Sequence, residues 1–137
     1  MTERDQRLTF VVLWVFAIFN YIYGDIGMVF SIFVHPEELV RLRQGLGSGG
    51  MSDTFFLGGA ILMEVAFATM LMSWIARLGV ARWANILAGV LFTLVMAVIT
   101  FARGIPALNY YSFCGVIEIV TTAYIGWRAW NWRPSAA

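Results

Sequence analysis

The chain has little charge and no lysine. Only 12% of its 137 residues are charged, about half the share of an ordinary soluble domain, and the mean hydropathy is +0.78. All nine basic residues are arginine and the net charge is +1, which argues against nucleic acid as a partner. This composition predicts that lipid, rather than water, surrounds most of the protein.

Cysteine and histidine each occur only once. A single cysteine, Cys114, excludes an internal disulfide. The single histidine, His35, cannot supply a pair of axial ligands to a haem iron. Neither HExxH nor ExxH is present, and one histidine without a cysteine partner makes a weak metal site. The sequence therefore predicts no metal and no cofactor.

What the chain does have is four long apolar runs. Each is long enough for a membrane-spanning helix, which needs about 20 residues. They cover residues 9–34, 54–75, 83–101 and 108–129. The first follows Arg4 and Arg7, as the apolar part of a signal peptide would, but it is too long and no cleavage site follows it. We predict a single all-α domain over residues 1–137, an integral membrane four-helix bundle whose main partner is the lipid bilayer.

The arginines predict the orientation of this bundle. If the N-terminus is cytoplasmic, six arginines lie on the inner side and three on the outer side, which favours cytoplasmic N- and C-termini. The tryptophans fall near the same inner face and are typical of an interfacial belt. They are Trp14, Trp74, Trp83, Trp127, Trp130 and Trp132. In the first outer loop, residues 36–43 predict a short amphipathic helix, followed by a flexible linker at residues 45–50.

Three carboxylic acids interrupt the apolar runs: Asp25, Glu64 and Glu118. An ionised carboxylate that faces lipid costs several kcal/mol. At 1.5 Å per residue, Glu64 and Glu118 each lie about 15 Å from the outer ends of their helices, and Asp25 lies about 12 Å from its own. The similar depth predicts one shared site near mid-membrane. Because the runs contain no basic partner there, we expect the acids to share protons, with at least one protonated at neutral pH.

Each run also carries a weakly polar stripe at helical spacing, which predicts the inward face of its helix. In the second run this stripe is Ala60, Glu64 and Ala68. The side chains that we expect to contact a ligand are Asn20, Tyr21, Tyr23, Asn85, Thr93 and Tyr111. Three of them have an alternative role: Tyr21 and Tyr23 also suit core packing and hydrogen bonding to Asp25, and Tyr111 also suits an outer interfacial belt.

Five segments together carry a resemblance to a known family. They are Tyr21-Ile22-Tyr23-Gly24-Asp25, Arg82-Trp83-Ala84-Asn85-Ile86-Leu87-Ala88-Gly89, Tyr110-Tyr111-Ser112-Phe113, Ile117-Glu118-Ile119 and Ala129-Trp130-Asn131-Trp132. This pattern resembles a family of small bacterial four-helix membrane proteins catalogued only as a domain of unknown function. The resemblance implies a four-helix fold in the bacterial inner membrane and roles for Asp25, Asn85 and Glu118, but not for Glu64. It implies no activity or cofactor. In layout more than in motif, the chain is also similar to DoxX-like proteins.

Three functions are consistent with these features. The first is binding of a lipophilic small molecule, with isomerisation or cyclisation in which Asp25 and Glu118 are the acid–base pair and Glu64 is their neighbour. The second is proton-coupled transport of a small molecule by an oligomer, although no inverted repeat or broken helix is evident. The third is an accessory subunit or assembly factor whose acids meet a partner helix. Because four short helices enclose a small core, a homo-oligomer is also expected.

Overall fold

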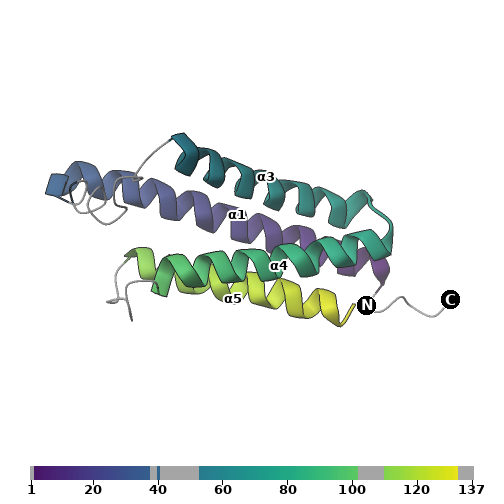
Figure 1. The fold of residues 1–137 in the computed structure, drawn as a ribbon. Coiled ribbons are helices and arrows are strands. Elements are labelled where there is room, and N and C mark those ends of the chain that lie inside the picture. The colour runs from purple at the N-terminus through teal and green to yellow at the C-terminus, as the bar shows by residue number, and fades with distance from the viewer. Residues whose placement is uncertain (1, 38–39, 41–52, 102–109, 133–137) are drawn as a thin grey trace.

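The computed structural model describes residues 2–37, 40, 53–101 and 110–132. Within these ranges it contains four α-helices and no β-strand (Figure 1). They are α1 (Glu3–Val34), α3 (Asp53–Ile75), α4 (Leu78–Phe101) and α5 (Tyr110–Trp130). The predicted all-α fold with four helices is confirmed.

Two helices begin earlier than the apolar runs predicted. α1 starts at Glu3 rather than near residue 9, because Thr2 and Asp5 form a capping box. The Asp5 backbone N–H donates to Thr2 Oγ1 (3.2 Å), and the Thr2 backbone N–H donates to the Asp5 carboxylate (2.9 Å). These bonds satisfy backbone donors that the first turn leaves free. α4 likewise starts at Leu78 rather than near residue 83. Apolar residues mark the part of a helix that is buried or in lipid, and in α1 the capping box begins the helix before that part.

Each helix packs against two neighbours (Figure 1). α3 and α5 both lie beside α1 and beside α4, so α1 and α4 are diagonal to each other across the core. α1 begins, α3 ends, α4 begins and α5 ends at the same end, which we call the Arg7 end. We call the opposite end the Tyr110 end, and α1 extends beyond the other helices there. The arrangement is an up-down-up-down bundle.

A buried hydrogen-bond network joins three helices near the Arg7 end. Asn85 Oδ1 of α4 accepts a hydrogen bond from Trp14 Nε1 of α1 (2.8 Å). Asn85 Nδ2 donates to Ser73 Oγ of α3 (2.7 Å) and to the carbonyl oxygen of Ala81 (2.7 Å). Asn85, Trp14 and Ser73 are all fully buried. The network therefore fixes how α1, α3 and α4 are aligned.

Two of the six tryptophans do not belong to the predicted interfacial belt. Trp14 and Trp132 are buried in the core, and the Trp132 ring stacks on Phe10 with the ring centroids 4.8 Å apart. The other four tryptophans are exposed. The prediction is therefore wrong for Trp14 and Trp132, because proximity to a helix end does not say whether a ring points inward or outward.

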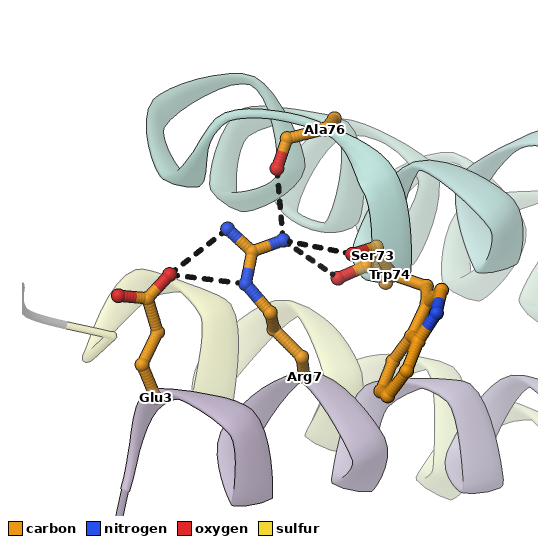
Figure 2. Close-up of polar contacts among 5 residues, drawn as sticks. All are labelled: Glu3, Arg7, Ser73, Trp74 and Ala76. Carbon is orange, nitrogen blue, oxygen red and sulfur yellow. Dashed lines mark hydrogen bonds and ion pairs between the residues drawn. The ribbon is translucent and has the colours of Figure 1, made fainter.

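Arginines from α1 and α4 cap the C-termini of the neighbouring helices, and Figure 2 shows the first of these, Arg7. Arg7 Nη1 donates to the carbonyl oxygens of Ser73 (3.2 Å), Trp74 (3.3 Å) and Ala76 (2.8 Å). Glu3 holds the other side of this guanidinium, with Oε1 3.0 Å from both Arg7 Nε and Nη2. Arg82 Nη2 donates to the carbonyl oxygen of Trp130 near the end of α5 (2.9 Å). A basic side chain in this position satisfies carbonyl groups that a helix end leaves free.

α4 and α5 approach closely at a pair of glycines. A Cβ atom added to Gly89 would lie 2.8 Å from the Cα and N atoms of Gly126 and 2.9 Å from the carbonyl oxygen of Thr122. One turn further along α4, Thr93 Oγ1 lies 2.9 Å from Thr122 Oγ1. Glycine is therefore required at position 89 for the two backbones to pack this closely.

Three of the described helices are long and apolar enough to cross a membrane: α1, residues 56–75 of α3, and α4. The outward-facing surface of the helices is correspondingly apolar. The predicted amphipathic helix at residues 36–43 lies mostly outside the described residues, and the linker at residues 45–50 lies entirely outside them.

Candidate ligand site between α1 and α5

Glu118 of α5 is a buried carboxylic acid. Only 3% of its surface is exposed. A Cβ atom added to Gly24 of α1 would lie 3.8 Å from Glu118 Oε1 and 3.8 Å from Cys114 Cβ. Cys114 and Glu118 are one turn apart on α5 and so share a face. Gly24 thus lets this face of α5 lie directly against the backbone of α1.

Asp25 lies near Glu118 but is exposed. The two carboxyl groups are close enough to interact electrostatically. Asp25 is exposed to the outside of the bundle, and so are the apolar side chains of Ile22 and Ile26 beside it. The pair therefore has one member that a molecule outside the bundle can reach and one that is enclosed between helices.

Two polar groups on the preceding residues are buried without a hydrogen-bond partner in the described part of the chain. They are Tyr21 Oη and Asn20 Nδ2. Tyr21 is also within electrostatic range of Glu118, and its ring packs against Phe92 of α4 with the centroids 5.7 Å apart. Buried polar atoms without a partner are uncommon and need an explanation. Together with the two carboxyls, the Tyr21 hydroxyl supplies donors and acceptors for a polar group of a ligand.

Tyrosines close the interface between α1 and α5 at the Tyr110 end. Tyr110 Oη donates a hydrogen bond to the carbonyl oxygen of Tyr23, and the two rings pack edge to face. The Tyr110 ring also covers Gly27, where an added Cβ atom would overlap it. Tyr23 itself is 62% exposed. Tyr23 therefore contributes to this interface through its backbone carbonyl group and the contact of its ring with Tyr110.

Glu64 does not join this group. It lies on α3, which packs against α1 and α4 but does not contact α5. Glu64, Ala60 and Ala68 are exposed, while Ala66 and Ser73 on the other face are buried. The prediction that the first three residues face inward is therefore wrong. Apolar side chains surround α3 so evenly that the sequence does not show which face is buried.

Asn85 and Thr93 form hydrogen bonds at other places in the bundle. The amide of Asn85 belongs to the network with Trp14 and Ser73 described above. Thr93 Oγ1 donates to the carbonyl oxygen of Gly89 (2.7 Å) and lies beside Thr122 between α4 and α5. The Tyr111 side chain is outside the described part of the structure. Of the predicted site residues, the structure thus brings together Tyr21, Asp25 and Glu118.

Two neighbours of the site, Gly24 and Cys114, were not predicted from the sequence. Gly24 immediately precedes Asp25, and Cys114 is four residues before Glu118, so both have the spacing that would place them beside the carboxyls. Among the described residues, no three His, Cys, Asp or Glu side chains are grouped in a way that could hold a metal ion.

Comparison with known proteins gives one match. The model of a family described as "Family of unknown function (DUF6326)" matches residues 1–137. No curated protein and no solved structure matches the chain.

Proposed function

The chain belongs to this family of unknown function, and from the geometry between α1 and α5 we propose that it is a membrane protein that binds a lipophilic small molecule. The observation that supports this most directly is the carboxyl pair, in which buried Glu118 lies near exposed Asp25 and near the unpartnered hydroxyl of Tyr21. Ionisable groups inside a membrane are costly and usually have a function.

In this proposal all four helices cross the membrane. α5 packs along α4 from the Arg82–Trp130 contact at the Arg7 end to the contact between Thr100 and Gly115 near the other end, so it covers the same thickness as α4. Both termini are cytoplasmic, because the Arg7 end carries most of the arginines. The site then lies within the membrane, and its ligand comes from the bilayer.

The chemistry of the site suggests an apolar molecule with a hydroxyl, carbonyl or amine group. The exposed side chains of Ile22 and Ile26 favour an apolar body next to Asp25. Two carboxyls that share a proton can donate one hydrogen bond and accept another, and Tyr21 adds a further donor. The same pair can move a proton to and from the bound molecule, so isomerisation or cyclisation is the catalytic form of this proposal. Glu64 is not part of that machinery.

Mass spectrometry of the small molecules that copurify with the protein tests the proposal. We expect wild-type protein to retain a lipophilic compound, and Asp25→Asn and Glu118→Gln to retain at least tenfold less. The reason is that an amide cannot carry the negative charge of a carboxyl pair that shares one proton, and loss of a hydrogen bond to a charged group costs about 1.5–3 kcal/mol, which is about tenfold or more in affinity.

Glu64→Gln is the matched control, because it makes the same chemical change on a helix that does not contact α5. It should retain the compound at the wild-type level. The proposal fails if wild-type protein carries no such compound, or if the three variants retain it equally.

Proton-coupled transport is the second candidate, and the arrangement of the pair favours it. A proton exchanged between an exposed carboxyl and an enclosed one connects two environments, as transport requires. The compound identified above distinguishes the two functions: a transporter moves it across a proteoliposome membrane when a pH gradient is applied, whereas a binding protein or enzyme does not. The third predicted role, an accessory subunit, is supported only by Glu64, which faces away from the bundle.

A further inference from the structure

The face of α3 that points away from the bundle carries a seven-residue repeat. In heptad notation, positions a are Leu57, Glu64 and Leu71, and positions d are Ala60, Phe67 and Trp74. All six side chains are exposed. Apolar residues at a and d are the pattern with which two parallel helices pack side by side. The face that α3 presents to α1 and α4 is a different one, centred on Ala66 and Ser73.

Glu64 is the exception in this apolar repeat. It lies at the midpoint of α3 and is exposed, and no described residue forms a hydrogen bond or ion pair with it. A carboxyl that faces lipid at this depth is costly. The chain has no lysine, and α3 contains no arginine or histidine. Whatever covers this face must therefore bring a polar group to the same depth as Glu64.

We propose that the outer face of α3 binds α3 of a second copy of this chain, with Glu64 of each copy opposite Glu64 of the other. Copies inserted with the same topology present α3 in the same direction, so position 64 lies at the same depth in both. In a parallel pair, residues at a positions face each other. The two carboxyls then share a proton in a hydrogen bond between them, and each satisfies the other.

The repeat also explains why the outer face of α3 has one acid and why this acid, Glu64, lies at the midpoint of the helix. A single polar residue at an a position fixes the register and number of helices, because any shift leaves it facing apolar side chains. Ala60, one turn away, lets the two backbones approach closely. The paired surface does not involve α5, so dimerisation leaves the candidate ligand site between α1 and α5 uncovered.

Disulfide crosslinking of purified protein in lipid vesicles tests the proposal. We expect Leu57→Cys and Leu71→Cys to form covalent dimers on oxidation, because both are a positions. The matched control is Leu87→Cys, which replaces an exposed leucine on α4 and should crosslink severalfold less. Wild-type protein gives the background, because its only cysteine, Cys114, is buried. Dilution of the protein with excess lipid should not remove the Leu71→Cys dimer.

Changing Glu64 in the Leu71→Cys background tests the carboxyl pair itself. Glu64→Gln should keep the crosslinked fraction, because an amide both donates and accepts. Glu64→Leu should lower it severalfold, because lipid supplies no hydrophobic force to replace the lost hydrogen bonds. Equal crosslinking at positions 71 and 87, no dimer at all, or an undiminished dimer in Glu64→Leu would overturn the proposal. None of these results depends on whether a ligand binds at Asp25 and Glu118.

Discussion

The side-chain amide of Asn85 joins three helices. Its oxygen accepts from Trp14 on α1, and its nitrogen donates to Ser73 on α3 and to the backbone of α4 itself. In Asn85→Ala the buried Trp14 N–H loses its partner, whereas the Ser73 hydroxyl still donates to the carbonyl oxygen of Thr69 (2.8 Å). One buried polar group left unsatisfied costs about 1–3 kcal/mol. We expect the free energy of unfolding to fall by roughly 1–3 kcal/mol, as measured by equilibrium unfolding in detergent micelles.

Asn131→Ala is the control for this prediction. Asn131 is exposed, and its Nδ2 donates only to the carbonyl oxygen of Trp127 (2.8 Å). Its replacement should change the stability by about 0.5 kcal/mol or less. Should Asn85→Ala instead keep full stability and lose a bound compound, Asn85 would belong to a ligand site rather than to the framework of the bundle.

At the residue scale, the sequence could identify carboxyls in apolar helices but not the directions in which they point. Counting residues gives the depth of Asp25, Glu64 and Glu118 because the rise per residue is constant. The direction of a side chain depends on which face of its helix is packed. For Glu118 the glycine at position 24 and the small Cys114 make that face available to α1. For Glu64 nothing in its surroundings marks the buried face, so its outward direction could be learned only from the structure.

At the scale of the helices, the contact between Gly89 and Gly126 determines how closely α4 and α5 can pack. Gly89→Ala places a methyl group 2.8 Å from the backbone of α5, which is too close, so α4 and α5 must separate. Overpacking of this kind costs about 1–3 kcal/mol. We expect Gly89→Ala to lower the free energy of unfolding by about that amount, measured in the same micelles.

Gly126→Ala serves as the matched control, because Gly126 lies in the same contact between α4 and α5. A Cβ atom on Gly126 would lie 3.8 Å from the nearest atoms of α4, which is an ordinary contact. This variant should stay within about 0.5 kcal/mol of wild type, and removing a glycine from a helix interior even favours the helix. Equal effects of the two substitutions would show that the backbones are not packed as the structure has them.

The ends of the helices were the least predictable elements. The apolar runs located all four helices, but the start of α1 depends on the capping box of Thr2 and Asp5, which lies outside the apolar run. The end of α3 depends on Arg7, which is 66 residues from the first carbonyl group to which it donates. A contact between groups so distant in sequence cannot be inferred from local pattern. In the sequence Arg7 is evidence only of charge near a membrane surface.

At the scale of the whole molecule, the composition and the spacing of the apolar runs were enough to predict the architecture. Four apolar helices joined in sequence, with a short turn between the second and third, leave an up-down-up-down bundle as the simple arrangement. The sequence could not show that the carboxyls divide between two surfaces. Asp25 and Glu118 belong to the interface of α1 and α5, whereas Glu64 belongs to the outer face of α3. The predicted cluster of three acids is therefore one pair, Asp25 and Glu118, and one separate acid, Glu64. We propose a different function for each.

The proposed dimer requires every copy of the protein to have the same orientation in the membrane. Gly79→Cys lies at the start of α4 at the Arg7 end, and Phe33→Cys lies at the far end of α1; both positions are exposed. If the arginine-rich Arg7 end is cytoplasmic, a membrane-impermeant maleimide should label Phe33→Cys in intact cells and Gly79→Cys only after lysis. Wild-type protein should remain unlabelled because Cys114 is buried. The reverse labelling would place the termini outside. Labelling of both positions in intact cells would mean mixed orientations, and α3 of two copies could then no longer be counted on to run in the same direction.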